Sequence, residues 1–168
     1  MEQPGKMLIT QGMRPFAQRV ANQLSERQRK HVLFGSSEEM PQVLLRLDNY
    51  LKIPQVSTAA FAHEMLKTCL DKHVAILIPL GVDELYPLAE ARQLFSEYGI
   101  TICVPSPTEL AELAIIENPP KQLPLLLLHH GRPVVADQEQ AIGQYGTLSG
   151  VFSPADSGDE LALCCVAD

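Results

Sequence analysis

The chain is poor in cysteine, and its four cysteines form no recognisable metal-binding pattern. They are Cys69, Cys103, Cys164 and Cys165. None belongs to a CxxC pair, and no histidine stands at the spacing that would complete a zinc site. Neighbouring residues of a strand point to opposite faces, so Cys164 and Cys165 are not expected to form a mutual disulfide. We therefore expect free, buried or half-buried thiols in a reducing compartment, and no metal.

Long apolar runs and an excess of basic side chains are also missing. No apolar run approaches the roughly 20 residues of a membrane span. The opening residues MEQPGKMLIT lack the charged start and long apolar stretch of a signal peptide, so a cytoplasmic location is expected. The net charge is −7, and an acidic chain repels phosphate backbones. Neither a membrane nor a nucleic acid is therefore an expected partner.

The glycine and serine motifs of common enzyme classes are missing as well. The turn after the first predicted strand, at residues 10–14, has only Gly12 where a dinucleotide site would have three glycines. No serine stands in a GxSxG nucleophile elbow. The sequence thus predicts no cofactor and no catalytic residue.

What is present is an alternation of short β-like runs with helix-like segments. The 168 residues, 46% of them hydrophobic, suit one domain with a small appendage. Residues 74–80, VAILIPL, form a continuous apolar strand of the kind found in parallel sheets. Strands are expected at 6–10, 31–34, 55–57, 74–80 and 100–104, and helices at 15–30, 40–51, 58–70, 83–98 and 108–116. This order predicts an α/β fold with a doubly wound, mostly parallel sheet.

The last third of the chain reads differently. Asn118-Pro119-Pro120-Lys121 is a predicted hinge. Beyond it, the runs 125–129 and 133–136 flank His130-Gly131-Arg132, and the runs 146–152 and 160–166 flank SPADSGD. These are two hairpin-like pairs. We therefore predict an α/β domain at 1–118 and a small β-rich appendage at 122–168, which either extends the sheet or packs as a subdomain.

Several segments of the first part resemble a known family. They are MLITQGMRPFAQRVANQL, YLKIPQV, FAHEMLKTCLDKHV, ILIPLGVDELYPLAEARQLF and EYGITICVPSPTELAEL. Together, residues 5–113 resemble the pre-ATP-grasp, Rossmann-like N-terminal domain of ATP-grasp proteins such as the large subunit of carbamoyl-phosphate synthase. The resemblance implies the fold predicted above.

The resemblance does not extend to the module that performs ligation. In that family a lysine-containing helix and a long ATP-grasp module follow this domain. Here residues 112–121 read ELAIIENPPK and lack the lysine pattern, and the remaining residues leave no room for that module. We therefore expect a non-catalytic module that binds a small ligand or a protein, either as a homodimer or with a separate ATP-grasp partner. The alternatives are a Rossmann-type enzyme that binds a nucleotide at the Gly12 turn, and a fragment of an ATP-grasp ligase.

Candidate ligand-binding residues follow the predicted strands, because open parallel sheets bind ligands at the carboxyl ends of their strands. Arg14 could pair with a phosphate or carboxylate of a small anionic metabolite. Asp83 and Glu84 either stabilise a helix N-terminus or bind a cation. The predicted crevice comprises Gly12, Arg14, Gly81, Asp83, Glu84 and Ser106. His129 and His130 are expected to be a solvated pair beside a turn.

Overall fold

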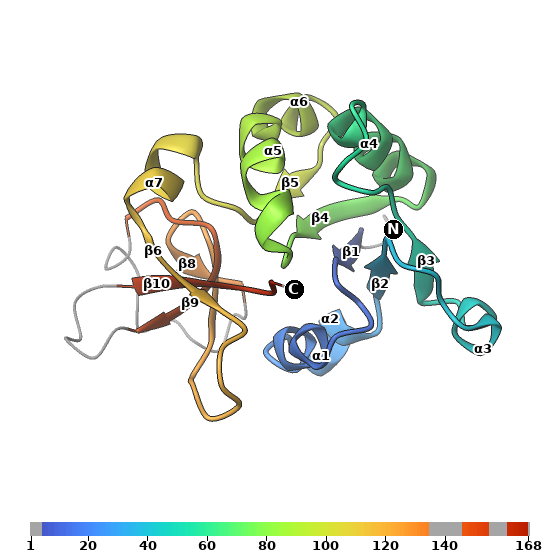
Figure 1. The fold of residues 1–168 in the computed structure, drawn as a ribbon, viewed down its shortest axis with the longest axis horizontal. Coiled ribbons are helices and arrows are strands. Elements are labelled where there is room, and N and C mark those ends of the chain that lie inside the picture. The colour runs from blue at the N-terminus through green and yellow to red at the C-terminus, as the bar shows by residue number, and fades with distance from the viewer. Residues whose placement is uncertain (1–4, 135–145, 155–160, 168) are drawn as a thin grey trace.

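A five-stranded parallel sheet forms the first part of the molecule (Figure 1). The structure is a computed structural model, and it describes residues 5–134, 146–154 and 161–167. The strand order is β3-β2-β1-β4-β5. The strands are β1 Lys6–Ile9, β2 Val32–Ser36, β3 Tyr50–Lys52, β4 Val74–Ile78 and β5 Thr101–Ile102. Every pairing in this sheet is parallel, which confirms the predicted doubly wound α/β fold.

Helices cover both faces of this sheet, as in other doubly wound folds. Figure 1 shows α1 and α2 on one face and α4, α5 and α6 on the other. The helices are α1 Pro15–Ala21, α2 Glu26–Arg29, α3 Gln42–Leu45, α4 Phe61–Asp71, α5 Leu85–Glu90, α6 Arg92–Glu97 and α7 Pro107–Glu112, with a 3-10 turn, η1, at Val82–Glu84. Gly99, with a φ of 78°, ends the α5–α6 region, as its position predicted.

The prediction of one continuous helix at 15–30 is wrong, because the structure has two helices there, α1 and α2. The chain leaves the helix after Ala21 and starts a new one after Ser25. The Ser25 hydroxyl accepts a 3.1 Å hydrogen bond from the backbone N–H of Gln28, and the Gln28 side chain accepts a 2.9 Å bond from the backbone N–H of Ser25. This reciprocal capping box satisfies two amide groups that an uninterrupted helix would satisfy internally.

Further predicted elements are corrected by the structure. The predicted helix at 40–51 is limited to α3, and the predicted helix at 83–98 is divided into η1, α5 and α6. The third strand is Tyr50–Lys52 rather than 55–57, because Tyr50 and its neighbours pair with β2. The predicted helix at 108–116 begins after Ser106 and ends at Glu112. Residues 114–117 instead form strand β6. Their pairing with the C-terminal strand, a contact distant in sequence, overrides the helical spacing of Leu110, Leu113 and Ile116.

A second five-stranded sheet, of mixed direction, holds the C-terminal part. Its order is β6-β10-β9-β7-β8. The strands are β6 Ala114–Glu117, β7 Leu126–His129, β8 Arg132–Pro133, β9 Gly150–Pro154 and β10 Leu161–Cys165. β7 and β8 form an antiparallel pair around His130-Gly131, whose φ values of 51° and 77° suit a tight hairpin turn. β9 pairs antiparallel with both β10 and β7, and the connection from β9 to β10 lies outside the described residues.

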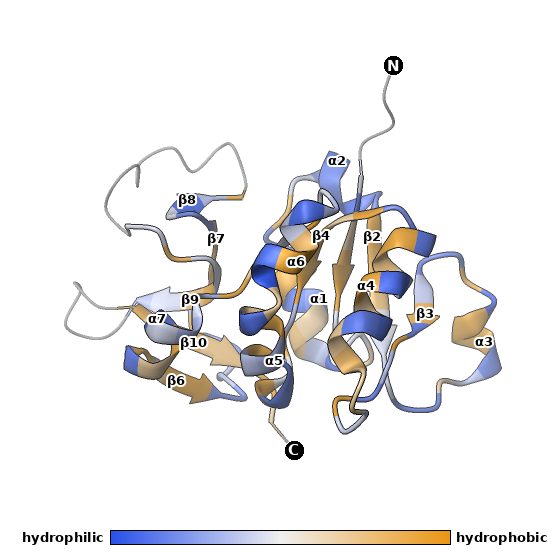
Figure 2. Ribbon diagram, turned by 90° about the horizontal axis from the view of Figure 1, so that it is seen from above, coloured by the Kyte–Doolittle hydropathy of each residue, from blue (hydrophilic) through white to orange (hydrophobic). Residues whose placement is uncertain are grey.

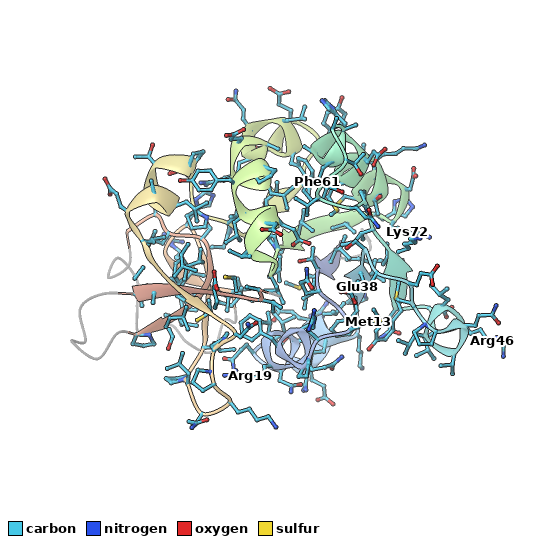
Figure 3. All side chains as sticks on the ribbon, viewed as in Figure 1. Met13, Arg19, Glu38, Arg46, Phe61 and Lys72 are labelled. Atoms are coloured by element: carbon cyan, nitrogen blue, oxygen red, sulfur yellow. The ribbon has the colours of Figure 1, made fainter. Side chains whose placement is uncertain are left out.

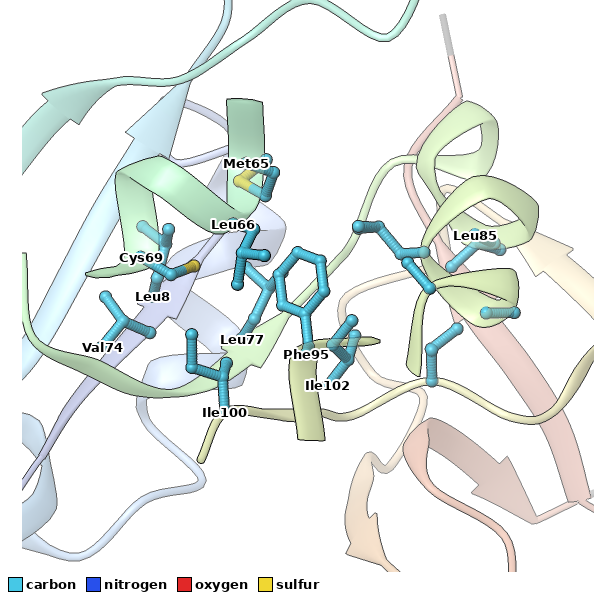
Figure 4. Close-up of a cluster of buried hydrophobic side chains, with 14 of the residues drawn as sticks. Leu8, Met65, Leu66, Cys69, Val74, Leu77, Leu85, Phe95, Ile100 and Ile102 are labelled. Carbon is cyan, nitrogen blue, oxygen red and sulfur yellow. The ribbon is translucent and has the colours of Figure 1, made fainter. Parts of the chain in front are cut away.

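The two sheets share their hydrophobic cores. One cluster lies under α4, α5 and α6, around the fully buried Phe95 (Figure 4), and includes Leu163 and Cys165 of β10. The other lies under α1 and includes Cys164 and Val166. Alternate residues of β10 thus face opposite clusters, as the pleat of a strand requires. Because β6 already lies within 1–118, the second sheet begins before the predicted hinge, and the division into two domains stays a prediction.

Candidate functional site

The predicted crevice lies where β1 and β4 end side by side. From β1 the chain continues to β2 on one side, and from β4 it continues to β5 on the other, so this is the topological switch point of the sheet. Thr10 follows β1, and Leu80 and Gly81 follow β4. In folds of this kind a ligand would lie against these three residues.

A closed hydrogen-bond network occupies this position. The backbone N–H of Leu80 donates a 2.8 Å bond to the Thr10 hydroxyl. That hydroxyl donates a 2.5 Å bond to Oε2 of Glu84, and the N–H of Gly81 donates a 3.1 Å bond to the same oxygen. The carboxylate of Glu84 is therefore held by the exits of both central strands.

Glu84 and Asp83 have different surroundings although they are adjacent. Glu84 is only 2% exposed, whereas Asp83 is exposed to solvent. Burial raises the pKa of the Glu84 carboxyl, while the hydrogen bonds from Thr10 and Gly81 lower it, and burial has the larger effect. Of the two acids predicted to meet a ligand, Glu84 is buried, and its hydrogen bonds hold the ends of β1 and β4 together.

Gly12 and Gly81 are glycines because neighbouring groups approach their backbone closely. The N–H of Gly12 donates a 2.8 Å bond to the carbonyl of Gly35, and a side chain at Gly12 would lie 2.7 Å from Cβ of Phe34. A side chain at Gly81 would meet Gln11 and Glu84 at 2.8 and 3.0 Å. The space beside both glycines is thus filled by the protein itself.

The C-terminal segment covers the switch point. Val166 follows β10 and pairs in parallel with Gly81. Its N–H donates a 2.6 Å bond to the carbonyl of Leu80, and its carbonyl accepts a 2.9 Å bond from the N–H of Val82. Val166 is 6% exposed, and Figure 1 shows the C-terminus between the two sheets. The segment that follows β10 therefore lies across the predicted crevice.

Arg14 lies beside a separate, smaller cleft of about 240 Å³ between α1 and the start of the segment that follows β6. Arg14 forms a 3.7 Å ion pair with Glu38. Arg19, which also lines the cleft, donates hydrogen bonds to the carbonyls of Pro119 and Leu123 at 3.2 and 2.8 Å. Figure 3 shows Arg19 on the α1 side of the molecule. The guanidinium of Arg19 thus ties α1 to the connection between the sheets.

Ser106 lies elsewhere, at a larger cleft of about 460 Å³ between the two sheets. One wall comes from α5, α6 and the end of β5, and the other from the β7–β8 turn and Ser149. The polar lining includes Arg92, Gln93, Thr101, Ser106, His129 and His130. The six predicted residues are therefore not gathered in one crevice. Gly81 and Glu84 meet at the switch point, Gly12 packs against β2, Asp83 is exposed, and Arg14 and Ser106 line different clefts.

A polar network supports one end of this cleft. Ser106 caps α7 by accepting a 3.1 Å bond from the N–H of Glu109, and its own N–H donates a 3.0 Å bond to Oε1 of Glu109. The same Oε1 lies 3.9 Å from Nη1 of Arg92. Thr147 donates a 3.2 Å bond to the other carboxylate oxygen. Glu109 thereby positions the Arg92 guanidinium beside the β7–β8 turn.

His129 and His130 differ from the predicted solvated pair. Their rings lie 4.2 Å apart between centroids. His130 is exposed, and its N–H donates a 2.9 Å bond to the buried Ser149 hydroxyl. His129 is half-buried, and its Nε2 is a buried atom with no hydrogen-bond partner among the described residues. Burial, together with His130 and Arg92, lowers the pKa of the His129 ring, which is therefore neutral at pH 7.

Neither Arg92 nor the buried face of His129 was predicted from the sequence. Arg92 reads as one more polar residue of an amphipathic helix, and only the position of the β7–β8 turn across the cleft from α6 brings it to the same site as His129. Within the described ranges, no three His, Cys, Asp or Glu side chains gather closely enough to hold a metal ion. No described helix has the length and apolarity needed to cross a bilayer.

A family model described as the PylC-like, N-terminal domain matches residues 7–103. The matched range runs from β1 through β5 and thus contains the whole parallel sheet. The search of curated proteins finds no match.

Proposed function

We propose that this chain, which belongs to the family of PylC-like N-terminal domains, is a non-catalytic module that binds a small anionic metabolite in the 460 Å³ cleft. The family carries a pre-ATP-grasp-type fold, as expected from the sequence. A relationship to carbamoyl-phosphate synthase in particular stays a prediction. The cleft's volume lies within the range typical of sites for small ligands.

The observation that carries the proposal is the unpaired Nε2 of His129. Buried polar atoms are almost always hydrogen-bonded, and a buried atom without a partner costs about 1–3 kcal/mol. A ligand bound in the adjacent cleft would supply the missing partner. His129 lines that cleft together with Arg92.

The guanidinium of Arg92 is the group of the lining that can bind an anion. Arg92 is a permanent cation, and its contact with Glu109 at 3.9 Å is loose enough to admit a second acceptor. A carboxylate or phosphate oxygen could accept from the guanidinium and from a protonated Nε2 of His129. Glu90, the acid of the lining, is exposed, so solvent screens its charge.

The alternative of a nucleotide at the Gly12 turn has less support. Gly12 contacts β2 directly, and Val166 pairs with the exit of β4. A nucleotide bound there would have to displace the chain's own backbone pairing. A separate ATP-grasp protein as partner rests on the family resemblance alone. We also propose a reducing compartment, such as the cytoplasm, because all four thiols are free and buried.

Titration calorimetry with inorganic phosphate and with citrate tests the proposal, and ethylammonium serves as the cationic control. At least one anion is expected to bind, and the cation is not. The Arg92→Ala variant should weaken anion binding about 10- to 100-fold, because a hydrogen bond to a charged group contributes about 1.5–3 kcal/mol. Arg46→Ala, which removes the exposed arginine that follows α3 as its C-cap, is the matched control and should leave the affinity unchanged.

A second measurement uses stability instead of binding. If the unpaired Nε2 of His129 is kept for a ligand, His129→Leu should raise the free energy of unfolding in the absence of ligand and abolish anion binding. The proposal is wrong if neither anion gives heat, or if Arg92→Ala binds as tightly as the parent chain.

A further inference from the structure

One edge of the parallel sheet presents apolar side chains to solvent. Seven large apolar side chains are exposed in the described part of the chain, and three of them fall within five residues: Val43 at 68%, Leu45 at 48% and Leu47 at 48%. They belong to α3 and to the connection that follows it. Helix α3 has no buried residue, and Figure 2 shows it as an apolar element at the periphery of the molecule. We call residues 38–52 the α3–β3 edge.

The strand beside this helix is the outermost of its sheet. β3 pairs with β2 through Tyr50, Leu51 and Lys52. No other described strand pairs with its second side. An edge strand of this kind presents backbone N–H and C=O groups that can bond to another strand. The N–H of Tyr50 already donates a 3.4 Å bond to the carbonyl of Leu47, so the α3–β3 edge combines a partly unpaired strand with exposed apolar side chains.

A groove of about 280 Å³ lies between α3 and β3. Its lining is Glu39, Met40, Gln42, Leu45 and Lys52. One wall thus carries an acid and the other a base, with apolar side chains between them. A surface that holds both members of a charge pair is complementary to a second copy of itself after a twofold rotation.

The edge carries charges of both signs. Residues 38–52 contain three acids and two bases. A second copy that meets this edge can therefore place opposite charges against one another.

We infer that the α3–β3 edge is a homodimer interface that a second copy of this chain covers in solution. Two β3 strands pair antiparallel across the twofold axis and join the two parallel sheets. Val43 of each copy enters the groove of the other, and Glu39 of each copy pairs with Lys52 of the other. This inference is independent of the anion-binding cleft, which lies between the two sheets of one copy.

Sedimentation or light scattering of the full chain gives the first test. At micromolar concentrations we expect twice the 18.5 kDa mass of the single chain. Val43→Asp should return the protein to the mass of one chain, because it places a charge in the apolar centre of the interface. Tyr98→Asp is the matched control, since Tyr98 is another exposed apolar side chain, at the end of α6, and it should leave the dimer intact.

Charge reversal then locates the interface. Glu39→Lys alone and Lys52→Glu alone each place like charges opposite one another and should dissociate the dimer. A one-to-one mixture of the two variants restores both pairs and should give a heterodimer. The double variant should dimerise with itself. A parent chain that is monomeric throughout this range overturns the inference, as does a dimer that Val43→Asp and both single charge reversals leave unchanged.

Discussion

The hydroxyl of Thr10 and the carboxylate of Glu84 lie 2.5 Å apart, in a bond that joins the exits of the two central strands. Thr10 also accepts from the N–H of Leu80, so one side chain links β1, β4 and η1. All the groups of this network belong to the switch point, where related sheets hold ligands. In this protein the polar groups at the switch point form hydrogen bonds with one another.

Replacing Thr10 with valine should destabilise the fold by about 2–3 kcal/mol. Valine has nearly the same shape but leaves the N–H of Leu80 without its partner and leaves Oε2 of Glu84 with the N–H of Gly81 as its remaining donor. Thr10→Ser keeps the hydroxyl and should lose much less. Urea unfolding measures both, with Thr108→Val on the exposed side of α7 as control. A loss in Thr10→Val no larger than in the control would contradict the network's role.

The buried Glu84 should make stability depend on pH in a defined direction. Its pKa is raised above 4.5 in the folded protein. The stability contributed by the neutral carboxyl is therefore fully present below pH 4.5 and is lost as the pH rises through the folded pKa. The Glu84→Gln side chain does not titrate. From pH 4.5 to pH 8, the free energy of unfolding of the parent chain should fall relative to that of Glu84→Gln, and parallel profiles would disprove this assignment.

Removing the N–H of Val166 should detach the C-terminal segment from the switch point. Val166→Pro deletes the donor of the 2.6 Å bond to Leu80 and leaves that carbonyl unpaired, which should cost about 1–3 kcal/mol. Amide hydrogen exchange of Val82, whose N–H donates to the Val166 carbonyl, should accelerate. Val166→Ala keeps the backbone donor and serves as the matched variant. Equal amide exchange rates of Val82 in the two variants would show that the Val166 pairing does not close the crevice at the ends of β1 and β4.

The four thiols should be nearly inert in the folded protein. Burial raises the pKa of Cys69 and of Cys103 to about 12 and that of Cys164 to about 11. A rise of the pKa from 9 to about 12 lowers the thiolate fraction roughly a thousandfold and a rise to about 11 roughly a hundredfold, and the thiolate is the reactive form. Labelling with a thiol-reactive aromatic disulfide at pH 8 should be slow until urea unfolds the chain, when all four cysteines react. Rapid labelling of any one of them in the folded state would contradict its burial.

The parallel sheet could be predicted because its signals are local. The apolar run at 74–80 and the helix stop at Gly99 can be read within a few residues, and the structure confirms a central strand and a helix end there. The break between α1 and α2 also had a local signal, because Ser25 and Gln28 have the spacing of a capping box. That signal was outweighed by the helical spacing of Phe16, Val20 and Leu24.

The candidate site could be predicted only in part. The sequence placed Gly81 and Glu84 at the carboxyl end of β4, where they lie, but the opening they border is covered by Val166. Arg92 and His129 come together because the β7–β8 turn packs beside α6. Such a contact depends on the order of strands in the second sheet, and no periodicity in either segment reports it.

By itself the sequence determined the α/β class, the parallel sheet, the cysteines' lack of a metal pattern and the pre-ATP-grasp-type family. These follow from side-chain periodicity, from turn and capping residues and from family motifs, all of which act over short distances along the chain. Only the tertiary structure decided that β6 is a strand and that the segment after β10 pairs with the end of β4. It also decided that a cleft lined by Arg92 and His129 lies between the sheets. Those features arise from backbone pairing and packing between segments far apart in sequence, where the burial of shared apolar faces outweighs local preference.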